Sequence, residues 1–245
     1  MARIHIGTSG WQYRHWRGTF YPERVKGVAL LPFYARHFRS VEVNTTFYRL
    51  ARPGAAARWR QQVPSDFVFA CKGSRFITHM KKLKDPETSL PRFLAAIAGL
   101  GEKLGPILFQ LPPRWGPDLE RLDAFLAALP PGHRYAFELR DEGWIVPATL
   151  DLLARRNAAF CAYDIAGRQS PVETTADFAY VRLHGPGAAY QGSYDDRVLE
   201  GWAERLEAWR AGGRDAYCYF DNDEKAYAVQ DALRLQQLLG REPPE

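Results

Sequence analysis

The sequence predicts a single (β/α)8 barrel of the TIM type, and three observations support this fold class. The length of 245 residues is usual for one such barrel. Eight short apolar runs recur along the chain, and stretches of helix length separate most of them. Each run ends in a polar or charged residue, as expected of strands that deliver side chains to one rim of a barrel. The runs are residues 3–9, 41–44, 67–72, 107–110, 135–140, 159–164, 178–184 and 216–222.

Apolar residues repeat with helical spacing between most of these runs. Segment 166–177 is the exception, because it is too polar and too rich in breakers for a full helix, so we expect a degenerate unit between the sixth and seventh strands. The rival fold, an open doubly wound sheet, is disfavoured because no Gly-rich phosphate fingerprint follows the first strand. The predicted helices are residues 30–38, 55–62, 89–104, 118–129, 147–157, 199–210 and 225–239.

The composition predicts one domain over residues 1–240 and a flexible tail over 241–245. The chain enters a strand at once, without the apolar stretch of a signal peptide, and no run is long enough to cross a bilayer. Cys71, Cys161 and Cys218 lie within strand runs and lack metal-ligand spacing. We therefore expect buried, reduced thiols and a cytoplasmic protein. The net charge of +5 permits an anionic ligand without requiring nucleic acid.

Strand alternation predicts which side chains enter the barrel, because every second residue faces the same side. On the second strand Glu42 and Asn44 should face inward, and on the fifth Glu138 and Arg140 should do so. Unpaired buried charge costs several kcal/mol per ion, so these groups must pair with one another or with a ligand. We favour a charged pocket at the carboxyl-terminal rim over a self-neutralising layer of salt bridges. The same alternation adds His5, Ser9, Lys72, Gln110, Asp164, Arg182, His184, Tyr217, Tyr219 and Asp221.

Several motifs resemble the YecE-like family (domain of unknown function 72), in the right order and over nearly the whole chain. The resemblance implies a TIM-type barrel, some members of which have been compared with endonuclease IV-like folds, and it implies no established activity. Two segments depart from the family pattern: Asp141-Glu142-Gly143-Trp144 replaces a His-Pro-Ser-Trp-like segment, and Asp221-Asn222 replaces Asn-Asn. A role for the missing histidine is therefore not carried over. The matching motifs are Gly7-Thr8-Ser9-Gly10-Trp11, Phe20-Tyr21-Pro22, residues 41–48, 72–79, 108–113 and 137–144, Arg182-Leu183-His184-Gly185, and Tyr219-Phe220-Asp221-Asn222.

The inward residues best fit hydrolysis or elimination on a small anionic substrate, such as one bearing a phosphate. Lys72, Arg140 and Arg182 are candidates to clamp the anion. Glu138 is the favoured general base, and His184 is a candidate acid or proton shuttle. Further catalytic candidates are Glu42 and Asp164, and further substrate-binding candidates are Trp11, Asn44, Gln110, Tyr219, Asp221 and Asn222.

Three other functions remain open at this stage. A nuclease or phosphodiesterase could hold Mg²⁺ or Mn²⁺ through Glu42, Glu138, Asp164 and His184. A glycoside hydrolase could use Glu42 and Glu138 as its carboxylate pair. A non-catalytic module could bind a nucleotide or RNA, with the aromatic and cationic loop 11–17 stacking on a base. No interaction with a membrane is expected.

Overall fold

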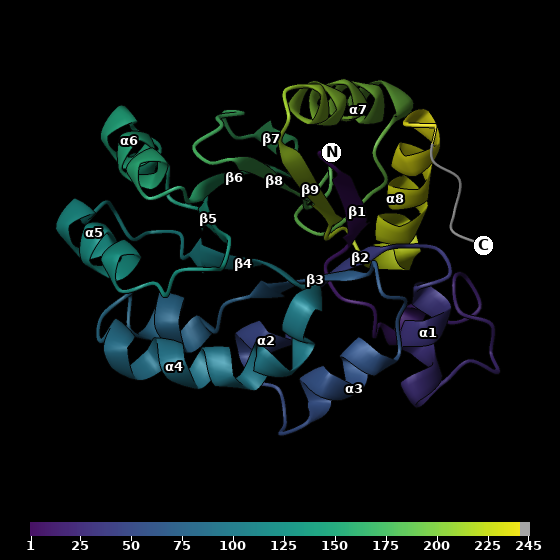
Figure 1. The fold of residues 1–245 in the computed structure, drawn as a ribbon. Coiled ribbons are helices and arrows are strands. Elements are labelled where there is room, and N and C mark those ends of the chain that lie inside the picture. Colours follow the sequence, from purple (N-terminus) through teal and green to yellow (C-terminus); the bar gives the residue numbers. More distant parts are fainter. Residues whose placement is uncertain (241–245) are drawn as a thin grey trace.

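The computed structural model describes residues 1–240, which form one α/β domain built on a nearly closed barrel of eight parallel strands (Figure 1). The barrel strands follow the order β1-β9-β8-β6-β5-β4-β3-β2, and the short β7 pairs antiparallel with β6. The predicted tail at 241–245 lies outside the described residues. The strands are β1 (Ile4–Thr8), β2 (Ser40–Val43), β3 (Val68–Lys72), β4 (Leu104–Leu111), β5 (Tyr135–Leu139), β6 (Ala159–Ile165), β7 (Arg168–Gln169), β8 (Phe178–Leu183) and β9 (Asp215–Phe220).

Helices connect most of the strands and lie around the barrel (Figure 1). Local sequence sets several of their first turns. The Asp118 carboxylate accepts a hydrogen bond from the Arg121 amide at 3.0 Å, and the Asp195 carboxylate accepts one from the Val198 amide at 2.9 Å, as N-caps do. The α-helices are α1 (Leu30–Tyr34), α2 (Thr45–Tyr48), α3 (Ala55–Gln61), α4 (Pro86–Ile97), α5 (Leu119–Ala127), α6 (Pro147–Arg155), α7 (Asp196–Ala211) and α8 (Tyr227–Leu238), with a π-helical turn at Phe76–Met80 and 3-10 turns at Arg14–Trp16, Gly27–Ala29, Ala98–Lys103, Glu142–Trp144 and Glu224–Ala226.

The strands divide the core into two layers, as alternation requires. An inner cluster fills the barrel, and a larger outer cluster packs the strands against the helices. The predicted orientation is confirmed for β2, β3, β4, β5, β8 and β9. The three cysteines are free and buried, also as predicted. The inner cluster consists of Ala70, Leu108, Ala136, Ala159, Cys161, Phe178, Tyr180, Tyr217 and Tyr219.

The predicted orientation of β6 is wrong. Cys161 belongs to the inner cluster, whereas Ala162 belongs to the outer one, so Tyr163 faces inward and Asp164 does not. The Tyr163 hydroxyl donates to the Leu139 carbonyl at 3.0 Å. The acidic end of the strand suggested the opposite orientation, but Phe160 packs with the outer cluster and thereby fixes the alternation.

The barrel closes between β1 and β2 through a short seam. Ser9 forms an isolated parallel bridge with Glu42, and the Gly10 amide donates to the Glu42 carbonyl at 2.8 Å. Lower in the seam, Gly7 approaches Ser40 so closely that an added Cβ would lie 2.1 Å from the Ser40 carbonyl oxygen. Only a residue without a side chain fits there.

Within residues 1–240, the structure contains no helix with the length and apolar character needed to cross a bilayer.

Candidate functional site

Arg182 lies at the centre of the charged side chains at the carboxyl ends of the strands. It extends inward from β8, is fully buried, and uses all its guanidinium nitrogens. Its Nε donates to both Glu42 carboxylate oxygens at 3.1 Å, and its Nη1 donates to Glu138 Oε2 at 2.8 Å. Its Nη2 donates to Ser9 Oγ at 3.0 Å and to Asp221 Oδ2 at 2.8 Å. One side chain therefore joins groups on β2 and β5 with the residues that directly follow β1 and β9.

Glu42 is held as a buried carboxylate by neutral donors as well as by Arg182. The Ser9 hydroxyl donates to its Oε1 at 2.5 Å, and the Tyr180 hydroxyl donates to its Oε2 at 2.6 Å. Tyr180 belongs to the inner cluster, so Glu42 lies between the packed barrel interior and the site above it. Its lone pairs are occupied by protein donors.

Glu138 and His184 complete the network with Arg140. The Arg140 guanidinium forms an ion pair with Glu138, and its Nη2 lies 2.8 Å from His184 Nε2. His184 Nδ1 lies 3.1 Å from Asp221 Oδ2. His184 Nε2 also lies 3.1 Å from Glu138 Oε1, so the imidazole lies between two carboxylates and two guanidinium groups. We call Glu42, Glu138, Arg140, Arg182, His184 and Asp221 the buried ionic network.

The network favours the ionised form of two of its acids, Glu138 and Asp221. Burial alone would raise the pKa of Glu138, but Arg140, Arg182 and His184 hold it well below its usual range. Burial likewise opposes the ionisation of Asp221, yet Arg182 and His184 lower its pKa to about 2. Burial would lower the pKa of Arg182, whereas the carboxylates around it raise that pKa well above its usual value.

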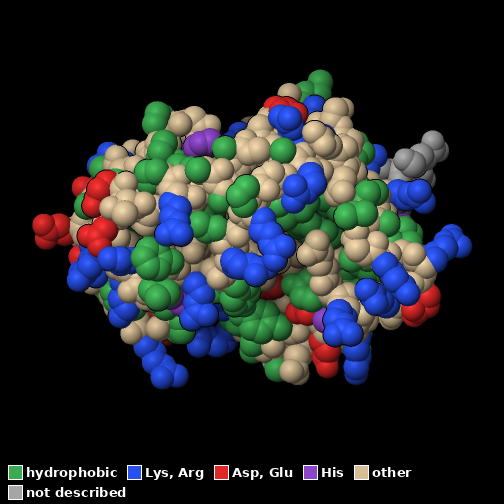
Figure 2. Space-filling view, turned by 90° about the horizontal axis from the view of Figure 1, so that it is seen from below, with side chains coloured by type: hydrophobic (Ala, Val, Ile, Leu, Met, Phe, Trp, Pro, Cys, Tyr) green, Lys and Arg blue, Asp and Glu red, His purple; other side chains and the backbone are tan. Residues whose placement is uncertain are grey.

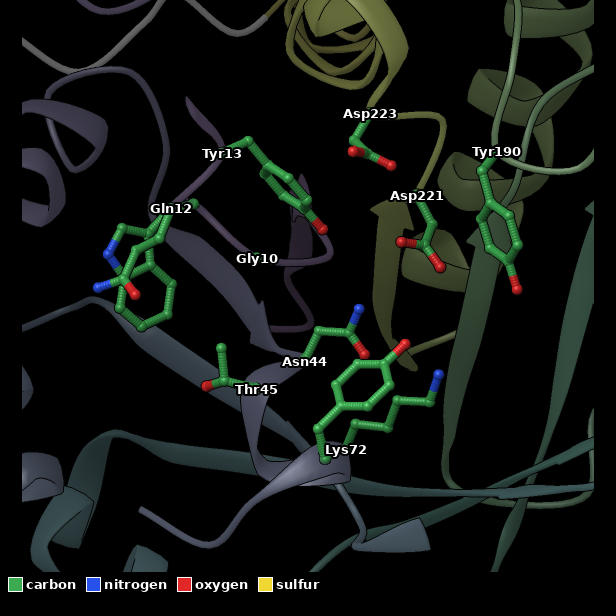
Figure 3. Close-up of a pocket in the computed structure, with 11 residues that line it drawn as sticks. Gly10, Gln12, Tyr13, Asn44, Thr45, Lys72, Tyr190, Asp221 and Asp223 are labelled. Atoms are coloured by element: carbon green, nitrogen blue, oxygen red, sulfur yellow. The ribbon is translucent and has the colours of Figure 1, made fainter. Parts of the chain in front are cut away.

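A cavity of about 390 Å³ lies over the seam between β1 and β2 (Figure 3). Its wall is made by the loop after β1, the first residues after β2, the end of β3, the end of β9 with the loop that follows, and Tyr190. A volume of this size is within the range of small-molecule sites. The lining residues are Gly10, Trp11, Gln12, Tyr13, Asn44, Thr45, Tyr48, Lys72, Tyr190, Asp221 and Asp223.

Lys72 is the basic side chain of this cavity wall. It is the last residue of β3 and is only 5% exposed. Its ammonium lies 4.4 Å from the centre of the Phe47 ring, and no carboxylate within residues 1–240 lies within 4.0 Å of it. Burial and the charge of Arg182 lower the pKa of Lys72 to about 8, although the acids of the network act against this.

The structure sorts the predicted site residues into three groups. Four of the predicted substrate-binding residues, Lys72, Asp221, Asn44 and Trp11, line the cavity. A second group lies within the network and outside the cavity lining. A third group lies elsewhere. The second group is Glu42, Glu138, Arg140, Arg182 and His184, and the third is Asp164, Gln110, Tyr219 and Asn222.

The members of the third group lie outside the cavity lining, and two of them form hydrogen bonds within the fold. The Tyr219 hydroxyl lies 2.6 Å from Ser40 Oγ inside the barrel. Asn222 Nδ2 donates to Asp231 of α8 and to the Gly192 carbonyl, each at 2.8 Å. Asp164 faces away from the barrel interior, and a hydrogen bond with Tyr194 opposes the rise in pKa that burial gives it. Gln110 pairs in register with Glu138 and is buried beside it.

Three of the predicted roles need correction. Arg182 cannot clamp a substrate, because its donors are already used by the protein. Glu42 and Glu138 are not a carboxylate pair across a cavity, because both are fully buried against Arg182. This arrangement does not fit the glycoside hydrolase geometry.

The proposed metal ligands do not fit a metal ion either. Glu42 and Glu138 accept from Arg182, while Asp164 faces away from them. Among residues 1–240, no group of three or more His, Cys, Asp or Glu side chains is arranged to hold a metal ion.

Of the further residues of the cavity wall, Tyr13 lies in loop 11–17, which the sequence offered for stacking on a base, whereas Asp223 and Tyr190 were given no role. Tyr13 packs its ring 4.7 Å from the Trp16 ring and donates from its hydroxyl to the Ser9 carbonyl at 2.6 Å. Asp223 follows Asp221 by two positions and pairs with His15. Tyr190 lies edge-on to His184, with 5.5 Å between ring centres, and comes from a loop with positive φ at Tyr190 itself. Loops without periodicity offer no signal for such placements.

The fold and the site together define a single-domain barrel protein with a charged cavity at the carboxyl-terminal rim. The chain belongs to the family described as protein of unknown function DUF72, whose model matches residues 5–245. This confirms the resemblance drawn from the motifs.

Two relatives are described as UPF0759 proteins. YecE of Escherichia coli strain K12 is 36% identical over 138 residues, which are 56% of this chain and 48% of YecE, so the match spans less than half of that relative. YunF of Bacillus subtilis strain 168 is 23% identical over 272 aligned positions, covering 96% of this chain and 94% of YunF.

Solved structures of two DUF72 family proteins share the fold. The protein from Thermotoga maritima gives a TM-score of 0.85 with 26% identity, covering 98% of this chain and all of that one. A protein from Enterococcus faecalis gives a TM-score of 0.83 with 20% identity, covering 98% and 96% of the two chains. The second likeness concerns the fold alone.

Proposed function

We propose that this protein is an enzyme of the hydrolase or lyase type that acts on a small anionic substrate in the cavity beside Lys72 and Asp221. The observation that carries the proposal is the position of Lys72. It is a nearly buried cation that opens into the cavity and has no carboxylate within 4.0 Å among the described residues. A buried charge without a close partner is costly, and an anionic ligand would offset that cost.

Lys72 also has the proton affinity that the chemistry needs. General acid–base catalysis works best when the pKa of the group lies near the working pH, and burial can bring a lysine there. The pKa of Lys72 falls to about 8 through burial and through Arg182. Glu138, the base predicted from the sequence, is sealed beneath the cavity and strongly ionised. We therefore assign proton transfer to Lys72 instead.

Asp221 has a different part in this proposal. Its pKa of about 2, set by Arg182 and His184 against the effect of burial, makes it a weak base at neutral pH. It serves as a fixed negative charge that faces the cavity, where it orients Lys72 and any positive charge that develops on the substrate. The other five members of the buried ionic network hold this carboxylate in place and lie outside the cavity lining.

The experiment is an unbiased metabolite pull-down analysed by mass spectrometry. Wild type is compared with Lys72→Met, and Lys81→Met is the matched control because Lys81 is a surface residue that pairs with Asp85 at 2.8 Å. We expect an anionic metabolite that wild type and Lys81→Met retain and that Lys72→Met loses. A set of retained metabolites that is the same for all three proteins would contradict the proposal.

A second candidate function, the binding of single-stranded nucleic acid, rests on a separate observation. Two hollows adjoin the cavity through Trp11, Gln12, Thr45 and Tyr48, and no Asp or Glu is among the described residues that line them. Figure 2 views the side on which α3 and α4 lie, where blue Lys and Arg side chains are spread among apolar ones. The arginines of the two hollows are Arg17, Arg49, Arg52 and Arg58.

Arginine side chains next to aromatic faces suit the phosphates and bases of a single strand. The test is the retention of a single-stranded RNA oligonucleotide as salt is raised, because phosphate contacts weaken with salt. Arg49→Gln/Arg52→Gln should shift release to lower salt, whereas Arg156→Gln, at a surface pair with Asp123, should not. Equal release from all three proteins would contradict this function.

A further inference from the structure

We infer that the Lys72 amine condenses with a carbonyl group of the substrate to form an imine, which places the substrate among anionic aldehydes and ketones. This inference rests on the proposed function, because it concerns the same cavity. Its basis is geometric: the side chain reaches the cavity wall from the end of β3, and its stem is enclosed (Figure 3). An amine free of a close salt bridge can approach a bound carbonyl carbon.

The surroundings of Lys72 favour the neutral amine at a physiological pH. The Phe47 ring, 4.4 Å from Nζ, takes the place of solvent on one side. Burial is the main cause that lowers the pKa of Lys72 to about 8, and the positive charge of Arg182 adds to it. Roughly half of the molecules then carry a free amine near pH 8, against less than about 1% for an ordinary lysine. Lysines activated in this way form Schiff bases with carbonyl substrates.

Lys103 shows that burial alone does not create such a group. It is 8% exposed, close to the 5% of Lys72. Its ammonium, however, donates to the Arg60 carbonyl at 2.7 Å and to the Val63 carbonyl at 2.8 Å. These bonds hold the Lys103 amine against two backbone carbonyl oxygens. Within residues 1–240 Lys72 has no comparable acceptor, so the difference between the two lysines lies in their partners.

The condensation balances in atoms and charge. The ammonium of Lys72 first loses a proton to water, and the nitrogen lone pair then attacks the carbonyl carbon. The carbonyl oxygen takes up two protons in all, one of them from nitrogen, and leaves as water when the C=N bond forms. The net change converts an ammonium and a carbonyl into a protonated imine and one water. Hydrolysis by the reverse path releases the product.

The cavity complements this intermediate. A protonated imine keeps the positive charge of the ammonium that it replaces, so Asp221 faces a cation before and after the step. Arg182 and His184 hold the Asp221 pKa at about 2 although burial opposes them, and the carboxylate therefore stays ionised. The aromatic rings of Tyr13, Tyr48 and Tyr190 form part of the cavity wall.

The experiment traps the imine by reduction. Wild-type protein is incubated near pH 8 with glyoxylate, a small anionic aldehyde, and with cyanoborohydride, and the modified lysines are mapped by peptide mass spectrometry. We expect the carboxymethyl adduct at Lys72 to exceed that at the exposed Lys84 by about tenfold or more, because the cavity activates the Lys72 amine. Lys103 should stay unmodified. An adduct at Lys72 no greater than that at Lys84 in the folded protein would overturn the inference.

A parallel measurement separates this inference from the proposed function. Glycolate resembles glyoxylate but lacks the carbonyl, and its binding is followed as a thermal shift of wild type, Lys72→Arg and Lys72→Met. Lys72→Arg keeps the positive charge but cannot form the imine. One outcome is that wild type and Lys72→Arg bind glycolate, Lys72→Met does not, and no glyoxylate adduct is trapped at Lys72. This outcome would contradict the imine but would support the proposed function. The absence of both would contradict the two together.

Discussion

Arg182 Nη2 lies 2.8 Å from Asp221 Oδ2, and Asp221 belongs both to the buried ionic network and to the cavity wall. The ion pair therefore connects the group that organises the barrel rim with a group that faces a ligand. Three carboxylates, from Glu42, Glu138 and Asp221, depend on this one guanidinium.

Replacing Arg182 should destabilise the protein strongly. Arg182→Met removes the cation shared by Glu42, Glu138 and Asp221 and leaves buried carboxylates without their main partner. We expect a loss of about 3–5 kcal/mol in the free energy of unfolding, the usual cost of breaking a buried pair from one side. Urea denaturation measures it. The control Arg156→Met, at an exposed pair with Asp123, should cost less than about 1 kcal/mol. Similar small losses for both variants would contradict the central role of Arg182.

Asp221 should contribute stability that acid removes. Its pKa is about 2 in the fold, where Arg182 and His184 overcome the effect of burial, and 3.8 is its ordinary value. The unfolded chain therefore binds the proton more tightly, so the contribution is complete above about pH 4 and is lost as pH falls toward 2. The shift corresponds to roughly 2 kcal/mol.

The measurement for Asp221 is the stability difference between wild type and Asp221→Asn, followed by urea denaturation as the pH is lowered. We expect this difference to shrink below about pH 4. A difference that stays constant from neutral pH down to pH 2 would show that Asp221 does not carry the charge assigned to it.

Lys72 should lower stability at neutral pH in the absence of a ligand. Its pKa falls from 10.5 to about 8 because of burial and Arg182, so the folded chain holds this proton less tightly than the unfolded chain. The penalty is complete below about pH 8, is relieved as pH rises toward 10.5, and amounts to at most about 3 kcal/mol. Lys72→Met should therefore be more stable than wild type at neutral pH. The difference in free energy of unfolding between the two proteins should shrink as the pH rises toward 10.5.

Lys103 provides the matched control for the Lys72 variant. Lys103→Met leaves the Arg60 and Val63 carbonyl oxygens without their donor, so this variant should lose stability. Thermal unfolding of both variants tests this expectation, because Lys72→Met should raise the stability at neutral pH and Lys103→Met should lower it. Destabilisation of both at neutral pH would indicate that Lys72 is an ordinary structural lysine.

Gly7→Ala should disrupt the seam between β1 and β2. The new methyl would meet the Ser40 carbonyl oxygen at 2.1 Å, so one strand must move. We expect a cost of at least about 1–3 kcal/mol in thermal or urea unfolding. Gly201→Ala is the control, because that helical position is open and Ala is the better helix former by about 0.5–1 kcal/mol. Equal effects of the two changes would contradict the close approach.

The sequence predicts the strands well because apolar runs and alternation both report on them. The residues expected to face inward do so on most strands, and Glu42, Glu138, Arg182 and His184 do meet. The exception, Asp164, shows the limit of reasoning from charge: a polar residue at a strand end can face the outer layer, and Phe160 determines the outcome.

The division between network and cavity could not be predicted from residue types. Alternation gives the side on which Arg182 and Lys72 lie, but not the partners that each finds. Arg182 meets three carboxylates and becomes part of the interior, whereas Lys72 meets Phe47 and opens into the cavity. Tyr190 lies in an aperiodic loop, and its position over His184 depends on the folded backbone.

The loops that follow β1 and β2 lie on opposite sides of the seam at which the barrel closes, and both line the cavity. A ligand that contacts both Gln12 and Thr45 would bridge the seam between β1 and β2 and hold the two strands together. Occupancy should then slow amide hydrogen exchange along both first strands, far more than along β5 and β6 on the remote side. We also expect β1 and β2 to separate before the rest of the barrel unfolds on heating. Ligand binding should therefore be lost at a lower temperature than the global unfolding transition.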